Sequence, residues 1–199
     1  MNKQNLLIVG VGGQGIILAS DILSEAGLAT GYDVKKTDTL GMAQRGGSVI
    51  SHVRLASQVW SPLIKEGETD ILVAFEKLEA ARWSYFLRPG GLAIVNNHAM
   101  PPLSVSLGTH RYPSDEEIKN TLKQKTEHVL FVNGTTLAKE LGDIRTLNTL
   151  MLGYISSFLP MSVDTWKNCI SQRMSSKILQ INITAFDQGR KETSSVNLE

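Results

Sequence analysis

Cysteine is almost absent from this chain, because Cys169 is the single cysteine among 199 residues. One thiol cannot form a disulfide within the chain, and it cannot by itself supply the ligands of an iron–sulfur cluster. Cys169 lies in a segment with helical periodicity, so we interpret it as a small core residue. The four histidines have no metal-ligand spacing, and no nucleophile–base pair is visible in the pattern. We therefore predict no metal site and no catalytic residue in this chain.

An excess of either charge is also missing, since the formal net charge at pH 7 is only +1. Such a balance gives no reason to expect nucleic acid or an anionic membrane surface as a partner. No apolar run approaches the roughly 18 residues of a membrane-spanning helix, and the segment before Leu6 is too short for a signal peptide. We therefore expect a cytoplasmic protein.

The length suits one domain, on the prior of roughly 100–200 residues per domain. Residues 1–190 carry the apolar periodicity of a folded domain. Residues 191–199 are mostly polar, and we expect them to form a disordered tail.

Glycine, by contrast, is concentrated near the start of the chain. An apolar run at residues 6–9 ends in a glycine cluster, and helical apolar periodicity follows directly. This order predicts a buried strand, a tight turn and the start of a helix. Gly10, Gly12 and Gly15 have the spacing G-x-G-x-x-G, and Gly13 removes one more side chain. Glycines so spaced let a ligand approach the backbone, and the helix start favours a phosphate or carboxylate.

Strand and helix patterns alternate along the first two thirds of the chain, and the last third is helical. We predict strands near 6–9, 32–37, 48–55, 70–75, 92–95 and 129–132, and helices near 16–29, 77–86, 114–124 and 134–141. Residues 88–91 (Arg-Pro-Gly-Gly) predict a turn. The alternation predicts an α/β fold: a Rossmann-like three-layer sheet of parallel strands with helices on both faces.

A second glycine segment follows the second predicted strand. Gln44, Arg45, Gly46 and Gly47 lie in a stretch with little periodicity. The arginine offers a rigid fork of donors that suits a carboxylate or phosphate, and the glycines let the backbone come close to it. The next strand alternates, so Arg45 could share a polar surface with His52 and Arg54; a sheet with one solvated face explains the alternation equally well.

Ligands of such sheets bind at the carboxyl ends of the strands. The glycine turn, Glu76 and Asn96 all fall at predicted strand ends. The residues that we expect to contact a cofactor or other ligand are Gly10, Gly12, Gly13, Gln14, Gly15, Gln44, Arg45, Gly46, Gly47 and Glu76.

With these segments in place, the chain resembles the gamma-type component of the 2-oxoacid:ferredoxin (acceptor) oxidoreductases, and within that family the beta subunit of indolepyruvate ferredoxin oxidoreductase. The resemblance covers about residues 6–186. It depends on seven features of the sequence. These are the glycine turn, the Gln-Arg-Gly-Gly-Ser segment at 44–48, His52-Val53-Arg54, Glu76, Pro89-Gly90-Gly91, Asn148 with Leu152-Gly153, and Asn182 with Ala185-Phe186.

The resemblance implies an enzyme complex that oxidatively decarboxylates a 2-oxoacid with coenzyme A, giving acyl-CoA, carbon dioxide and reduced ferredoxin. It implies that thiamine diphosphate and the iron–sulfur clusters belong to a large partner subunit. It also implies that the present chain could hold coenzyme A. The Met-Ala-Gln-Arg segment at 42–45 favours indolepyruvate or another aryl-pyruvate. The isolated chain is then expected to be inactive.

Two other functions remain open at this point. One is a free-standing oxidoreductase that binds NAD(P) or FAD at the glycine turn. An NAD site usually places an acidic residue about 20 residues beyond the glycines, and this chain has Lys35 and Lys36 there. The other is a purely structural or regulatory subunit, in which the glycine turn packs against a second chain.

Overall fold

The computed structural model describes residues 2–40 and 46–194. Their centre is a six-stranded sheet with the strand order β2-β3-β1-β4-β5-β6. The strands are β1 (Gln4–Val11), β2 (Asp33–Leu40), β3 (Ser48–Ala56), β4 (Thr69–Ala74), β5 (Leu87–Asn96) and β6 (Val129–Val132).

The sheet is mixed, which corrects the prediction of a parallel sheet. Strands β1, β4, β5 and β6 are parallel, but β3 runs antiparallel to both β1 and β2. A parallel crossover needs a dozen or more residues, usually including a helix. Only residues 41–47 connect β2 to β3, so these two strands pair as a hairpin.

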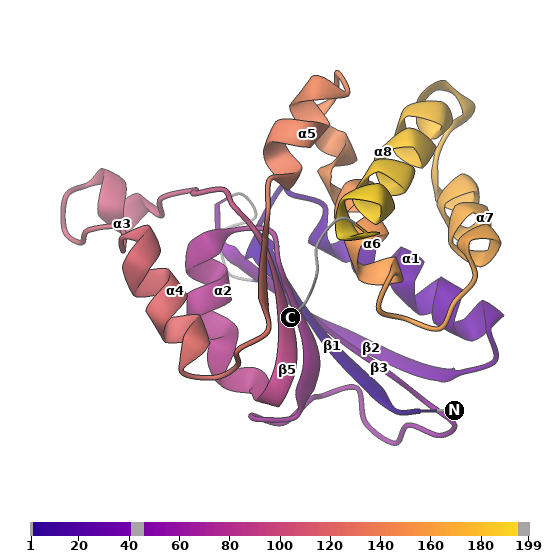
Figure 1. Cartoon of the computed structure of the whole chain (residues 1–199), viewed down its shortest axis with the longest axis horizontal. Coiled ribbons are helices and arrows are strands. Elements are labelled where there is room, and N and C mark those ends of the chain that lie inside the picture. The colour runs from indigo at the N-terminus through magenta and orange to yellow at the C-terminus, as the bar shows by residue number, and fades with distance from the viewer. Residues whose placement is uncertain (1, 41–45, 195–199) are drawn as a thin grey trace.

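Helices cover both faces of the sheet, as predicted (Figure 1). Along β1, Leu6 and Ile8 belong to the core under α1 (Ile16–Ala29) and the C-terminal helices. Leu7 and Val9 belong to the core under α2 (Lys77–Trp83) and α4 (Asp115–Lys123). The helices are α1 (Ile16–Ala29), α2 (Lys77–Trp83), α3 (Leu103–Ser106), α4 (Asp115–Lys123), α5 (Gly134–Glu140), α6 (Leu147–Ser156), α7 (Val163–Arg173) and α8 (Ser176–Ser194), with the short 3₁₀ helices η1 (Ser84–Phe86) and η2 (Ile144–Thr146).

The turn predicted at residues 88–91 is a bulge within β5. Strand β4 advances from Thr69 to Ile71 while β5 advances from Leu87 to Leu92. Gly90 has a φ of 70°. The glycine and proline signals therefore mark an irregularity in a strand, because the neighbouring strand continues the pairing on both sides of it.

The C-terminal third is helical, and α6 is its centre. All ten residues of α6 are buried. It crosses α8 so closely that a Cβ on Gly153 would lie 2.2 Å from the carbonyl oxygen of Phe186. Helix α8 continues through Ser194, so residues 191–194 of the tail predicted from the sequence are helical.

Serine side chains cap the amino ends of α4 and α7. Ser114 and Glu117 make a complete capping box at the start of α4, and the Ser162 hydroxyl caps α7 by accepting the Thr165 N–H at 3.1 Å. None of the helices in the described part of the chain is long and apolar enough to cross a membrane.

Candidate functional site

The two glycine segments of the sequence meet at the carboxyl end of β1. The N–H of Gly12 donates to the carbonyl of Gly47 at 2.8 Å. Gly10 has a packing role there, since a Cβ at this position would lie 2.7 Å from Gln14 Oε1 and 2.9 Å from Phe75 Cβ. Gln14 and Phe75 therefore leave no room for a side chain at position 10. The hydrogen bond to Gly47 fixes the backbone of Gly12.

Gln14 holds the glycine turn to the next strand of the sheet. Its Oε1 accepts the N–H of Val11 at 2.8 Å, and its Nε2 donates to the carbonyl of Phe75 at 3.1 Å. Phe75 directly follows β4. The amide of Gln14 therefore connects the carboxyl ends of β1 and β4 and shapes the turn from inside.

The turn leads into α1, whose first turn has no side-chain cap. Gly13 and Gly15 have φ values of 105° and 81°, which only glycine adopts at little cost. Gly15 is the N-cap and makes no side-chain cap hydrogen bond, and the first turn of α1 contains no acidic residue. The partial positive charge of the helix start is therefore not neutralised by a local side chain.

Asn148, in the first turn of α6, lies against this helix start. Its side chain is 6% exposed. Its Oδ1 accepts the Thr149 N–H at 2.7 Å, while within the described residues its Nδ2 has no hydrogen-bond acceptor. The Nδ2 atom is 2.8 Å from where a Cβ on Gly15 would lie. Because Asn148 lines an open pocket, this free donor is available to an acceptor that enters from outside the chain.

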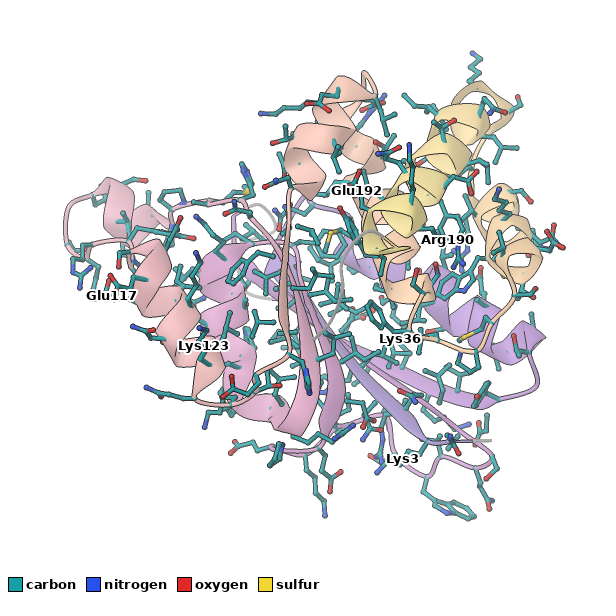
Figure 2. The ribbon with its side chains drawn as sticks, in the orientation of Figure 1. Lys3, Lys36, Glu117, Lys123, Arg190 and Glu192 are labelled. Atoms are coloured by element: carbon teal, nitrogen blue, oxygen red, sulfur yellow. The ribbon has the colours of Figure 1, made fainter. Side chains whose placement is uncertain are left out.

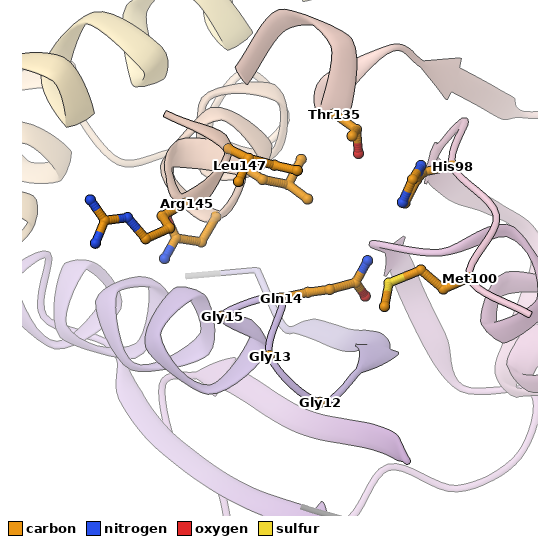
Figure 3. A pocket seen from close by; sticks show the side chains of 11 residues that line it. Gly12, Gly13, Gln14, Gly15, His98, Met100, Thr135, Arg145 and Leu147 are labelled. Atoms are coloured by element: carbon orange, nitrogen blue, oxygen red, sulfur yellow. The ribbon is translucent and has the colours of Figure 1, made fainter. Parts of the chain in front are cut away.

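A pocket of about 410 Å³ opens at this place. It is lined by the glycine turn, by residues after β5, and by the starts of α5 and α6; the lining residues are Gly12, Gly13, Gln14, Gly15, His98, Met100, Thr135, Ile144, Arg145, Leu147 and Asn148. Figure 3 shows His98 and Met100 on the side opposite Leu147 and Arg145. The pocket therefore lies at the carboxyl edge of the parallel strands, where α/β folds bind ligands.

The pocket wall combines polar and apolar groups. Burial, together with the positive charge of Lys139, lowers the pKa of His98, so its imidazole is neutral at pH 7. Met100 and Leu147 supply apolar surface. Arg145, at the rim, has its guanidinium paired with Asp143 at 2.6 Å. The arrangement suits a ligand with an anionic group at the helix start and an apolar portion beside it.

Glu76 lies at the end of β4 as predicted, but it does not line this pocket. It is 1% exposed and caps α2, accepting the Glu79 N–H at 2.9 Å. Its other oxygen accepts the Met100 N–H at 3.0 Å and the Tyr112 hydroxyl. Burial and this hydrogen bond raise the pKa of Tyr112. The carboxylate of Glu76 thus holds the segment that carries Met100, and ligand contact by Glu76 stays a prediction.

The Arg-Gly-Gly segment is described only in part. Gln44 and Arg45 lie outside the described residues. Gly46 has a φ of 80° and open space around it, and Gly47 contacts the glycine turn through its carbonyl. Neither lines the pocket as described.

The two lysines at the usual position of an NAD-site acid have structural partners. Lys35 pairs with Asp33 at 2.8 Å, and Lys36 pairs with Asp21 at 2.5 Å and with Asp38 at 2.8 Å. Strand β3 lies between β2 and β1, so β2 is not adjacent to the glycine-turn strand. The lysines are thus set apart from the pocket by the sheet order.

Strand β3 does not have the solvated polar face that was one explanation of its alternation. A polar surface shared by Arg45, His52 and Arg54 involves Arg45, which lies outside the described residues. His52 is 6% exposed and packs edge-on against Phe86 with ring centres 5.6 Å apart. Its Nδ1 accepts the Ile64 N–H at 3.3 Å. Arg54, near the carboxyl end of β3, donates to the carbonyls of Ser61 and Leu63 in the loop that follows the strand. The loop after β3 and the 3₁₀ helix η1 cover this face, which a strand pattern alone does not reveal.

Cys169 is buried. This burial raises the pKa of its thiol, and the negative charge of Glu25 raises it further. In the described part of the chain, no group of three or more His, Cys, Asp or Glu side chains could hold a metal ion. The donor set of these residues therefore does not fit an iron–sulfur cluster.

Sequence reasoning missed most of the pocket wall opposite the glycines. His98 follows β5 and Thr135 follows β6. The rule that placed Glu76 and Asn96 at strand ends would have found both. Arg145 and Leu147 have no comparable signal, because helix packing alone brings them to the site.

The model of the family described as pyruvate ferredoxin/flavodoxin oxidoreductase matches residues 5–192. The chain belongs to the pyruvate ferredoxin/flavodoxin oxidoreductase family. This confirms the resemblance found in the sequence, and the matched segment includes both the glycine turn and the pocket wall.

Individual family members agree in length and in fold. The chain is 37% identical over 194 residues to the indolepyruvate oxidoreductase subunit IorB of Pyrococcus horikoshii, covering 96% of each chain. The gamma subunit of a keto/oxoacid ferredoxin oxidoreductase from Geobacter sulfurreducens superposes with a TM-score of 0.72 at 22% identity, over 97% of this chain and 99% of that chain.

A second solved structure shows the same fold inside a longer polypeptide. It is 2-oxoglutarate:ferredoxin oxidoreductase from Magnetococcus marinus with 2-oxoglutarate, coenzyme A and succinyl-CoA bound. It superposes with a TM-score of 0.77 at 21% identity, over 100% of this chain and 32% of that chain. The predicted α/β fold is thus confirmed, and the chain is a small-subunit member of an oxidoreductase family.

Proposed function

We propose that this chain is the non-thiamine-binding subunit of a 2-oxoacid ferredoxin oxidoreductase that acts on indolepyruvate or another aryl-pyruvate. In the cytoplasm, the complex converts the oxoacid, coenzyme A and oxidised ferredoxin into acyl-CoA, carbon dioxide and reduced ferredoxin. The observation that carries the proposal is the 37% identity to a subunit named for indolepyruvate, over 96% of both chains.

Within that complex, the large partner subunit holds thiamine diphosphate and the iron–sulfur clusters. The single buried cysteine of this chain supports such a division. When bound, these groups supply the decarboxylation and electron-transfer chemistry. The residues described above contribute binding and positioning.

The pocket at the glycine turn receives an anionic part of coenzyme A or of the oxoacid. The uncapped start of α1 favours an anion, and so does the Nδ2 donor of Asn148, which makes no hydrogen bond within the described residues. The neutral His98 can donate or accept a hydrogen bond there without adding charge. In this proposal Gly12, Gly13 and Gly15 allow close approach, and Gln14 keeps the turn in shape.

The topology counts against a free-standing NAD(P) or FAD enzyme. In the dinucleotide-binding fold, an acidic residue about 20 positions after the glycine turn binds the ribose. Here Lys35 and Lys36 occupy that part of β2, and β3 separates β2 from β1.

Reconstitution with the large subunit tests the proposal directly. The assembled complex should reduce ferredoxin or a viologen dye with indolepyruvate in a reaction that requires coenzyme A, with a higher kcat/KM than for pyruvate or 2-oxoglutarate. The isolated chain should give no oxoacid-dependent reduction. Turnover by this chain alone would contradict the proposal, and a preference for pyruvate would contradict the substrate assignment.

A further inference from the structure

The loop between β3 and β4, residues 57–68, is unusual in what it exposes. Trp60 is 85% exposed and Leu63 is 58% exposed. The loop begins beside the start of β1, where Leu55 pairs with Gln4. It therefore lies at the amino edge of the parallel strands, away from the pocket at the glycine turn (Figure 1).

This loop is held in place at several points along its length. Arg54 Nη1 donates to the carbonyls of Ser61 and Leu63, each at 3.0 Å. The Val59 N–H donates to Asp33 Oδ2 at 2.7 Å. Near its far end, the Ile64 N–H donates to Nδ1 of the buried His52.

The loop also has its own buried anchors. Val59 is 6% exposed and Ile64 is 3% exposed, on either side of Trp60 and Leu63. Internal packing does not require the indole, because it remains in solvent while Val59 and Ile64 anchor the loop. A large apolar side chain on a pre-ordered loop loses little conformational freedom on binding, and tryptophan is enriched among residues that dominate interface energies.

The surroundings of Trp60 are positively charged. Trp60 borders a pocket of about 340 Å³ whose charged lining residues are Lys3, Arg54, Lys65 and Glu68. Lys3 lies at this edge of the molecule (Figure 2). Within residues 2–40 and 46–194, none of the three cations has a carboxylate within ion-pair distance, and Arg54 contacts only carbonyl and amide oxygens.

We propose that Trp60, Leu63 and the cationic pocket beside them form the docking surface for an acidic segment of the large partner subunit. The indole and Leu63 supply apolar area, and the three cations supply charge complementarity to carboxylates. A second copy of this chain fits less well, because a two-fold dimer would set each cation cluster against its own copy.

This inference depends on the proposed function for the existence of the partner. The chain then has two separate binding surfaces: the ligand binds at the carboxyl edge of the sheet, and the partner binds at the amino edge.

Hydroxyl-radical footprinting of the isolated chain and of the assembled complex tests the proposal. Oxidation of the peptide that contains Trp60 and Leu63 should fall at least fivefold in the complex. Unchanged oxidation in a complex that turns over would overturn the docking surface and leave the proposed function standing. Failure of the two subunits to associate would overturn both.

Protection that already appears in the isolated chain and increases with its concentration would instead indicate self-association, and would also overturn the proposal. Sedimentation measurements on the isolated chain identify that case. Sedimentation should show a monomer, and footprinting of that monomer should show an accessible Trp60.

Variants separate the apolar contribution from the charge. Trp60→Ala should weaken the affinity for the large subunit at least tenfold, with an unchanged melting temperature because the side chain is already exposed. Leu103→Ala, at a leucine that is 72% exposed on α3, is the matched control and should leave the affinity unchanged. Equal loss in both variants would overturn the specific role of Trp60.

Lys65→Glu should weaken binding, and the effect should diminish at high salt. Glu66→Lys changes the charge of the next residue, which does not line the pocket, and should not weaken binding. Tight binding by the Lys65→Glu variant would overturn the acidic character assigned to the partner segment.

Discussion

Asn148 Nδ2 lies 2.8 Å from the position that a Cβ on Gly15 would occupy. These residues are far apart in the chain, and each belongs to the start of a helix. The absence of a side chain on Gly15 lets the amide of α6 reach the uncapped start of α1. The candidate ligand pocket depends on this contact.

Asn148→Asp should damage ligand binding more than stability. The substitution keeps the oxygen that accepts the Thr149 N–H, and it replaces the unpartnered donor with a negative charge. A hydrogen bond to a charged group contributes about 1.5–3 kcal/mol, so the KM for coenzyme A or the oxoacid should rise at least tenfold. Steady-state kinetics of the complex measure this, with Asn120→Asp on α4 as the control. An unchanged KM would exclude Asn148 from the ligand site.

Substitutions in the glycine turn should distinguish ligand contact from a structural role. A Cβ at Gly13 would meet no atom within 4 Å, so the Cβ of Gly13→Val fits, while the substitution adds backbone strain at a positive φ and bulk in the pocket. We expect loss of activity in the complex with a melting temperature only a few degrees lower. A variant that unfolds would favour the structural interpretation of the turn, and full activity would exclude close approach of a ligand there.

Arg45→Lys tests the second glycine segment. Arg45 lies two residues before Gly47, whose carbonyl accepts the Gly12 N–H at 2.8 Å. Lysine keeps the charge and removes the forked donors, so a bidentate contact to a phosphate or carboxylate should weaken. The apparent KM for coenzyme A or the oxoacid should rise while the isolated chain melts unchanged. If subunit affinity falls and both KM values hold, Arg45 is an interface residue.

The crossing of α6 and α8 should tolerate no added methyl group. A Cβ on Gly189 would lie 2.1 Å from the carbonyl oxygen of Leu150. Gly189→Ala should therefore destabilise the chain by about 3 kcal/mol, at the upper end for overpacking. Gly108→Ala, where a Cβ would meet no atom within 4 Å, should cost only the strain of its positive φ. Urea unfolding of both variants measures the difference, and equal losses would show that the helices can move apart.

Stability should fall as the pH is lowered below about 6.5, in part because of His52. Burial lowers the pKa of His52 below its ordinary value, so the folded protein keeps the ring neutral while the unfolded chain takes up a proton. The unfolded state then binds more protons, and the free energy of unfolding decreases toward acid pH. Protonation would also remove the acceptor of the Ile64 N–H. Between pH 7 and pH 5, the melting temperature should fall more with decreasing pH for the wild type than for His52→Gln.

The alternation of strands and helices was determined by the sequence alone. The spacing of apolar residues differs between a helix and a strand, so it indicates which of the two each segment forms. The glycine turn at the end of β1 was determined in the same way. Its spacing is a local backbone requirement, and Gly13 and Gly15 do adopt positive φ angles. The caps at Ser114 and Ser162 likewise depend only on residues within one turn.

Strand direction and the far wall of the pocket were decided by the tertiary structure. The β2–β3 hairpin depends on a short connection, and a strand pattern does not encode the direction in which the next strand returns. Asn148, His98 and Leu147 reach the glycine turn only because α6 and the segment after β5 pack there. The burial of His52 has the same cause: the loop at residues 57–68 covers it, and the same loop leaves Trp60 in solvent.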